Sequence, residues 1–189
     1  MKKVIGKLKA ENKHVHVLDI GTGTGLLSMM AVACGADKVT AVEAFKPMIQ
    51  VAKNCLKSNG MHEKVKIIEK RSTEIIFGVD MLEKANVLVT EVFDTELIGE
   101  GAISTFTHAL ENLLEKDCHV IPDHGFMYVQ VVDSEICRDL NWLNKDGINL
   151  KIPKGDERIS GDFIYDIQLT EFNEFKEIGK IKKVLVKQL

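Results

Sequence analysis

A glycine-rich loop between an apolar run and a helix-length segment constrains the fold of this chain more than any other feature. Residues 15–20 are largely apolar, as in a buried strand, and they lead into Asp19-Ile20-Gly21-Thr22-Gly23-Thr24-Gly25. Residues 26–34 then predict a helix that ends at Gly35. Glycines in such a turn let the backbone approach a ligand closely. The segment therefore predicts a strand, a ligand-binding turn and a helix in succession.

The alternation of strands and helices continues beyond this helix. The sequence predicts strands at residues 39–43, 65–69 and 87–90, a helix at Lys46–Ser58 closed by Asn59-Gly60, and a further helix at residues 102–114. Parallel strands need crossover connections, so this order is typical of an α/β fold whose parallel sheet carries helices on both faces. Ligands of such sheets bind beyond the carboxyl ends of the strands.

The pattern changes near Pro122. Residues 126–132 and 163–169 are rich in β-branched and aromatic side chains, and residues 144–147 resemble a turn. These segments predict antiparallel strands. We therefore expect a nucleotide-binding type of domain at residues 1–121 and a β-rich remainder at residues 122–189, which is small for an independent core.

Composition restricts the partners of the chain. A hydrophobic content of 45% and a charged content of 28% are those of an ordinary globular protein, and the formal charge of −3 argues against direct contact with nucleic acid. No apolar stretch approaches the roughly 18 residues of a membrane span. Cys34, Cys55, Cys118 and Cys137 lie far apart, with no C-x-x-C pair. We expect reduced thiols, no metal site and an intracellular compartment.

The spacing of the glycines bears on the ligand. Gly21, Gly23 and Gly25 depart from the G-x-G-x-x-G spacing of dinucleotide sites. S-adenosylmethionine suits the loop better than a pyrophosphate, because it brings no phosphate to the helix amino terminus; a structural turn without a ligand is the alternative. Glu43 ends the second strand, where an acidic side chain can accept hydrogen bonds from ribose hydroxyls. Met48 either covers the adenine face or packs as an ordinary flexible side chain.

Two glutamates bracket an acidic stretch after the fourth predicted strand. Glu91 and Glu100 are nine residues apart, so a loop through Gly99 has to bring them together. Arginine stays protonated at physiological pH because its pKa is about 12.5 to 13.8. Paired carboxylates bind such a planar cation through charge-assisted hydrogen bonds. The pair indicates a guanidinium site, and a loop of exposed acids is the alternative.

Three segments together resemble the protein arginine methyltransferases. They are residues 17–28 with the glycine loop, Val42-Glu43, and residues 90–101, which read Thr-Glu-Val-Phe-Asp-Thr-Glu-Leu-Ile-Gly-Glu-Gly. The last segment is the specific part, and it is most similar to the monomethylating, type III branch of the family. The resemblance implies a Rossmann-like S-adenosylmethionine-dependent methyltransferase domain followed by a partial β-barrel.

The resemblance also implies roles for particular residues. Asp19, Gly21, Gly23 and Glu43 would bind the cofactor, Ser72 and Thr73 would lie near its adenine, and Thr105 would approach its methionine end. Glu91 and Glu100 would hold the substrate guanidinium. Two further acids of the loop, Asp94 and Glu96, would favour arginine-rich substrates.

The implied activity is methyl transfer from S-adenosylmethionine to an arginine nitrogen of a protein, giving monomethylarginine. Histones would be among the substrates, the cytoplasm and the nucleus would be the compartments, and the full-length family member would form a dimer or a tandem pseudo-dimer. The family's amino-terminal helical segment and its Thr-His-Trp loop find no match in this sequence. A truncated, non-catalytic module that binds the cofactor or a partner is therefore the alternative, and a small-molecule methyltransferase is a third reading.

Overall fold

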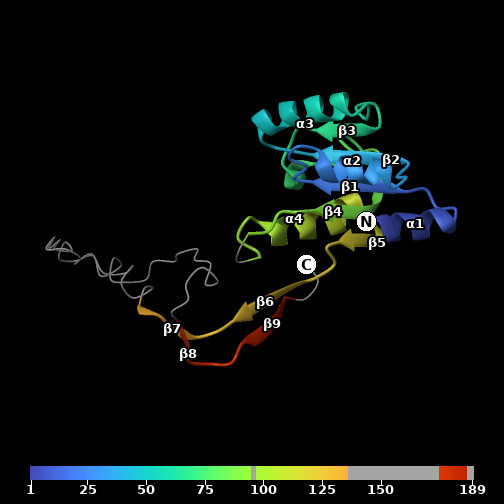
Figure 1. Cartoon of the computed structure of the whole chain (residues 1–189). Helices are drawn as coiled ribbons and strands as arrows, with labels where there is room; N and C mark the ends of the chain where they lie inside the picture. Colours follow the sequence, from blue (N-terminus) through green and yellow to red (C-terminus); the bar gives the residue numbers. More distant parts are fainter. Residues whose placement is uncertain (95–96, 136–174, 187–189) are drawn as a thin grey trace, which may run out of the picture. The chain divides into compact units, whose positions relative to one another are not determined.

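The structure is a computed structural model that describes residues 1–94, 97–135 and 175–186. A five-stranded parallel sheet forms the core of the amino-terminal part of the chain (Figure 1). Its strands lie in the order β3-β2-β1-β4-β5 and pair in parallel throughout. Their bounds are β1 His16–Ile20, β2 Lys38–Val42, β3 Val65–Ile68, β4 Ala85–Thr90 and β5 Leu114–Ile121. The predicted α/β class is confirmed, and the four predicted strands of the sheet are present within two residues at each end.

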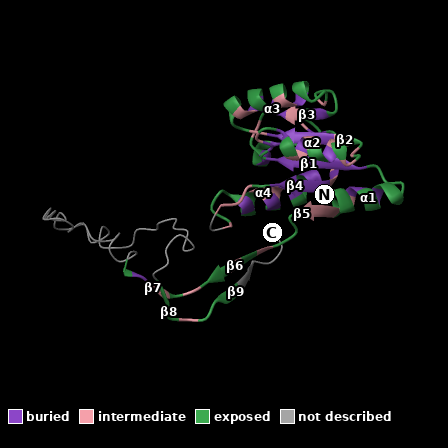
Figure 2. Ribbon diagram, in the orientation of Figure 1, coloured by how far each residue is buried: buried purple, intermediate pink, exposed green. Residues whose placement is uncertain are grey.

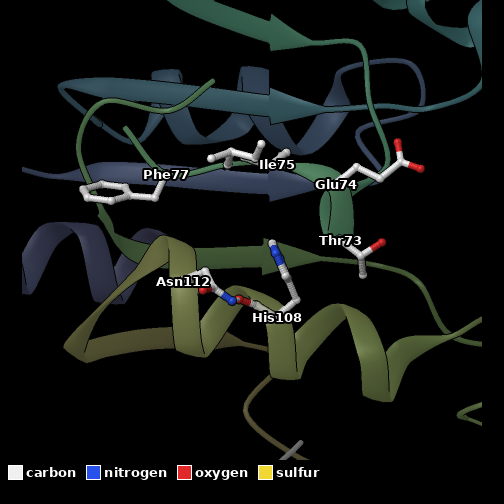
Figure 3. Close-up of a pocket in the computed structure, with 7 residues that line it drawn as sticks. Thr73, Glu74, Ile75, Phe77, His108 and Asn112 are labelled. Atoms are coloured by element: carbon white, nitrogen blue, oxygen red, sulfur yellow. Dashed lines mark hydrogen bonds between the residues drawn. The ribbon is translucent and has the colours of Figure 1, made fainter. Parts of the chain in front are cut away.

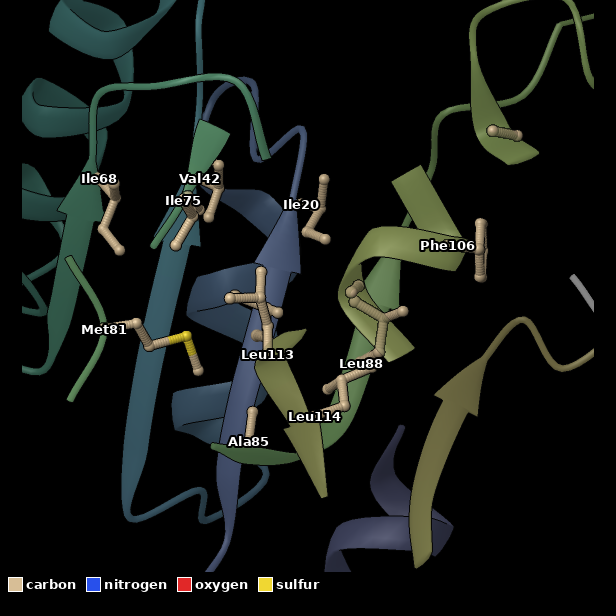
Figure 4. Close-up of a cluster of buried hydrophobic side chains, with 13 residues drawn as sticks. Ile20, Val42, Ile68, Ile75, Met81, Ala85, Leu88, Phe106, Leu113 and Leu114 are labelled. Atoms are coloured by element: carbon tan, nitrogen blue, oxygen red, sulfur yellow. The ribbon is translucent and has the colours of Figure 1, made fainter. Parts of the chain in front are cut away.

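The two faces of the sheet are covered by different parts of the chain. Successive side chains of a strand point to opposite faces. Val17 of β1 belongs to a core cluster that includes residues of three helices, α1 Lys2–Ala10, α2 Leu26–Ala33 and α3 Lys46–Ser58. Its neighbour Leu18 belongs to a second cluster with residues of α4 Ala102–His108 and of the β3–β4 connection (Figure 4). Strands β1, β2 and β4, between these layers, are almost entirely buried, as Figure 2 shows.

Helix α1 is absent from the sequence-based prediction. Only two of its side chains, Ile5 and Leu8, are buried, and four lysines occupy much of the remaining surface. Such a sparse apolar pattern gives a weak periodic signal. The helix nevertheless packs with Val15 and Val17 in one core cluster, which fixes it to the sheet.

The helix predicted at residues 102–114 continues to Leu113, but its second half is not α-helical. Helix α4 ends at His108, a single π-helical turn, η2, follows at Ala109–Leu113, and Leu114 already begins β5. The N–H of Leu114 donates to the carbonyl oxygen of Ala109, five residues earlier, as a π-helical turn requires. The spacing of Leu113 and Leu114 fits a helix, and their burial also fits a strand. Strand β5 lies at the edge of the sheet, where charged residues are common, and these charged residues hide the strand pattern in the sequence.

The remainder of the chain forms a second compact unit, Phe126–Leu185, in addition to a first unit that contains Met1–Gly125. Strand β6 Gly125–Val129 pairs with β9 Lys182–Val186, and β7 Val132–Asp133 pairs antiparallel with β8 Lys176–Glu177. These additional strands are consistent with the expected partial barrel. The strand and turn predicted at 163–169 and 144–147 lie outside the described residues, as does Cys137. The domain boundary at residue 121 stays a prediction.

Three of the cysteines, Cys34, Cys55 and Cys118, are free thiols. Among the described residues, no group of histidine, cysteine and acidic side chains is arranged to hold a metal ion. No helix in this part of the chain has the length and apolar character needed to cross a membrane.

Candidate functional site

The loop after β1 has a backbone conformation that favours glycine. Gly21 has a φ of 73°, and a Cβ there would lie 3.1 Å from Cγ1 of Val92. The N–H groups of Gly21 and Thr22 both donate to the carbonyl oxygen of Val42, at 2.9 and 3.0 Å. The loop is therefore held between the carboxyl ends of β2 and β4, where a parallel sheet binds its ligands.

Asp19 supports this loop from within the sheet. Its side chain is fully buried, and Oδ2 accepts hydrogen bonds from Thr22 Oγ1 and Ser28 Oγ, each at 2.6 Å. Burial raises the pKa of the carboxyl group, and the hydroxyls of Ser28 and Thr22 oppose that rise. Oδ1 is buried with no hydrogen-bond partner in the described residues. One carboxylate oxygen thus shapes the loop and the other is an unused acceptor.

Glu43 lies at the same edge, directly after β2. Its Oε2 accepts the N–H of Gly23 at 3.0 Å, and its Oε1 accepts the N–H groups of Ala44 and Phe45 at 2.9 Å each. A carboxylate offers about four acceptor positions, so one remains for a ligand hydroxyl. Glu43 therefore both orders the glycine loop and keeps the capacity that its predicted ribose contact requires.

A cavity of about 230 Å³ opens beside these residues. Six of the residues predicted to bind cofactor or substrate line it: Gly21, Glu43, Ser72, Thr73, Glu100 and Thr105. The other four, Asp19, Gly23, Met48 and Glu91, are not among the lining residues. Met48 is half-buried near the start of α3. Its adenine contact, like the other individual roles, stays a prediction.

The double-glutamate loop runs from the end of β4 to the start of α4. Glu91 follows β4, and Glu100 precedes Gly101, the residue that caps α4. Inside the loop, Asp94 accepts the N–H of Gly99 on Oδ1 at 3.1 Å and the N–H of Leu97 on its carbonyl oxygen at 2.9 Å. Thr95 and Glu96 are outside the described residues.

Both glutamates of the pair are exposed, and neither forms an ion pair or hydrogen bond within the described part of the chain. Two uncompensated negative charges thus flank one loop at the carboxyl edge of the sheet. Such an arrangement favours a cationic ligand.

Two cationic side chains that were not predicted from the sequence also line the cavity. Lys70 and Arg71 follow β3 and line the cavity. Lys70 is paired with Asp80 at 2.6 Å, whereas Arg71 makes no ion pair among the described residues. Their position after the carboxyl end of a strand is the signal that could have identified them. Arg71 gives the site a positive group opposite in charge to Glu43 and Glu100.

Comparison with known proteins gives matches to methyltransferases. Residues 3–125 match the family model described as Ribosomal protein L11 methyltransferase (PrmA). A solved structure of the Trypanosoma brucei PRMT1 enzyme-prozyme heterotetrameric complex with AdoHcy is 31% identical, with a TM-score of 0.64, over 72% of this chain and 43% of that one. A solved structure of Protein Arginine Methyltransferase 10 of Arabidopsis thaliana is 30% identical, with a TM-score of 0.60, over 66% of this chain and 34% of that one. The matched model and these solved structures therefore give the chain the fold of the methyltransferases.

Protein arginine N-methyltransferase 7 of Aedes aegypti is 49% identical over 177 residues, or 88% of this chain. Because relatives at this identity and structural neighbours carry the same family name, the chain belongs to the protein arginine N-methyltransferase family. It spans 26% of the length of the Aedes aegypti relative.

Proposed function

We propose that this protein binds S-adenosylmethionine in the cavity beside the glycine loop and transfers its methyl group to an arginine of a protein substrate. One observation carries the proposal: Gly21, Glu43 and Glu100, which come from three separate segments of the sequence, line a single cavity at the carboxyl edge of the sheet. In this proposal Glu100, as a ligand of the guanidinium, would lie beside the cofactor pocket. The trypanosomal relative was solved as a complex with AdoHcy, which supports the choice of cofactor.

The residues present fit that cofactor. A Cβ at Gly21 would crowd Val92, so the space along the loop depends on glycine. Glu43 keeps an acceptor for a ribose hydroxyl. Ser72 and Thr73 would border the adenine and Thr105 the methionine end.

When bound, S-adenosylmethionine supplies an electrophilic methyl group on a sulfonium. Glu100, on the cavity wall, and Glu91, at the end of β4, would accept N–H bonds from the substrate guanidinium and orient one nitrogen toward that methyl group. Most of the acceleration then comes from alignment and from electrostatic stabilisation of the guanidinium. As the new C–N bond forms, the bond between the methyl carbon and the sulfonium sulfur would break, leaving S-adenosylhomocysteine. The methylated nitrogen would release one proton, for which the nearby carboxylates are acceptors.

The degree of methylation and the wider context belong to the same proposal. Monomethylarginine is the expected product, because the loop at residues 90–101 is most similar to the monomethylating, type III branch of the family. Histones as substrates, the cytoplasm and nucleus as compartments, and a dimer or tandem pseudo-dimer for the longer protein follow from the family resemblance. Mass spectrometry of the product tests the degree of methylation, and sedimentation of the longer protein tests its oligomeric state.

The deciding experiment is a calorimetric titration of the purified chain with S-adenosylmethionine, followed by incubation with an arginine-rich peptide and mass spectrometry. We expect saturable binding and a product heavier by one methyl group. Binding without product would favour the alternative of a non-catalytic cofactor-binding module. Absence of binding by a folded chain would overturn the proposal.

Glu100→Gln separates the substrate role from the cofactor role. Loss of a charge-assisted contact to the guanidinium should lower kcat/KM by about tenfold or more, while S-adenosylmethionine affinity changes little. Glu63→Gln is the matched control, since Glu63 is exposed in the turn after α3 and lines no part of the cavity. Equal activities of the two variants would contradict the assigned role of Glu100.

A further inference from the structure

A second cavity lies in the same compact unit as the methyltransferase site. Its volume is about 540 Å³, against about 230 Å³ for the cavity at the glycine loop. The segment from Thr73 to Phe77 lines one side, and His108 and Asn112 line the other (Figure 3). Thr73 is the lining residue that the two cavities share. The proposed reaction uses none of the remaining residues of this second cavity.

The cavity exists because the connection between β3 and β4 contains no α-helix. A short 3-10 turn, η1 Ser72–Glu74, is followed by an irregular segment that crosses this face of the sheet. Ile75 of that segment is buried, but Ile76 and Phe77 are 58% and 45% exposed. The segment therefore leaves an aliphatic and an aromatic side chain partly exposed at the cavity, with Lys84 Nζ 5.6 Å from the centroid of the Phe77 ring.

The opposite wall presents a polar atom without a partner. His108 Nδ1 is buried and has no hydrogen bond in the described residues. Figure 3 shows the imidazole directed from α4 toward the segment that carries Ile75. Native structures rarely leave a buried polar atom unsatisfied, and each such atom calls for an explanation.

The backbone next to His108 is also unusual. The π-helical turn η2 begins at the next residue, and Asn112 Nδ2 donates to the His108 carbonyl oxygen at 3.0 Å. Single π-helical turns within helices occur frequently at functional sites. The turn fixes the last residue of α4, and with it the imidazole, at the cavity wall.

We propose that this cavity is a second ligand site, which takes a small planar aromatic molecule bearing one hydroxyl or N–H group. The ring of the ligand packs against Phe77 and Ile76, and its polar group hydrogen-bonds to Nδ1 of His108. The apolar side chains of Phe77 and Ile76 together with one unsatisfied imidazole nitrogen favour this class over a purely apolar molecule, and Thr73, Glu74, Ile75 and Asn112 complete the lining.

Fluorine NMR with 4-fluorophenol as the probe tests the site, and fluorobenzene, the same ring without the hydroxyl, is the matched control. We expect saturable binding of both, with 4-fluorophenol bound about fivefold more tightly, as one net hydrogen bond provides. S-adenosylhomocysteine should displace neither probe. No saturable binding, equal affinities, or displacement by S-adenosylhomocysteine would each overturn the proposal.

Variants of the chain assign the contact to His108. His108→Leu should abolish the preference for 4-fluorophenol, and His108→Asn, which keeps a polar atom at the same position, should retain part of it. His62→Leu changes an exposed histidine outside the cavity and should leave the preference intact. Circular dichroism establishes that each variant is folded. An unchanged preference in folded His108→Leu would refute the role of Nδ1.

Discussion

Replacing Gly21 by alanine tests how the loop after β1 is built. Gly21 has a φ of 73°, and the added Cβ would lie 3.1 Å from Val92 Cγ1. The left-handed conformation costs an L-residue about 1–2 kcal/mol, and the crowded contact adds about 1 kcal/mol because Val92 has to move. We expect Gly21→Ala to lower the free energy of unfolding by about 2–3 kcal/mol.

Gly60→Ala isolates the backbone part of this effect. Gly60 has a φ of 66°, and a Cβ there would meet nothing within 4 Å. Its replacement should therefore cost only about 1–2 kcal/mol. Urea unfolding followed by far-UV circular dichroism measures both variants. In a Val92→Ala background, the difference between the two glycine variants should disappear.

The reasoning would be refuted if Gly21→Ala were no more destabilising than Gly60→Ala, or if their difference persisted without the valine side chain. Calorimetry provides a second readout. Gly21→Ala should weaken binding of S-adenosylhomocysteine, because the loop that borders the proposed pocket is displaced, whereas Gly60→Ala should leave it unchanged.

The buried and loop residues support three further predictions. Burial lowers the pKa of His16 from its ordinary 6.5 to about 4. As the pH drops from 6.5 toward 4, the unfolded chain binds a proton at His16 that the folded chain does not, so the free energy of unfolding should fall. In urea titrations at several pH values, His16→Gln should show a shallower fall. Phe106→Ala should destabilise the chain by about 3–5 kcal/mol, against about 0.5 kcal/mol for the exposed Ile103→Ala of the same helix, and equal urea midpoints would contradict this core assignment. Asp94→Asn should raise KM for an arginine-rich peptide with little effect on cofactor affinity, and unchanged peptide kinetics would count against a role for this loop in substrate binding.

The fold was predictable where local periodicity and tertiary packing agree. Strands β1, β2 and β4 are largely buried on both faces because helices or connections cover both, so each appears in the sequence as a largely apolar run. Helix α1 and strand β5 escaped prediction because each buries only part of its surface. The π-helical turn at Ala109–Leu113 has no signal of its own in the sequence.

The site was predictable to the extent that its residues occur at strand ends. Gly21, Glu43 and Glu100 follow the rule that ligands bind beyond the carboxyl ends of parallel strands, and all three line the cavity. Ser72, Thr73 and Thr105 depended on the family resemblance, since nothing in their local pattern marks them. Neither approach could show that Asp19 would direct one oxygen to Thr22 and Ser28 and leave the other unpaired. That arrangement depends on how the loop folds back over the strand.

The central place of β1 in the sheet has a consequence during synthesis of the chain. Its partner β2 ends at Val42, but its other partner, β4, ends at Thr90, whose hydroxyl donates to the carbonyl oxygen of Ile20. At a translation rate of about 5–20 residues per second, the ribosome needs about 2–10 s to make the intervening segment. Throughout that interval the middle strand of the finished sheet has an open edge on the nascent chain, and open edges are where strands pair with the wrong partner.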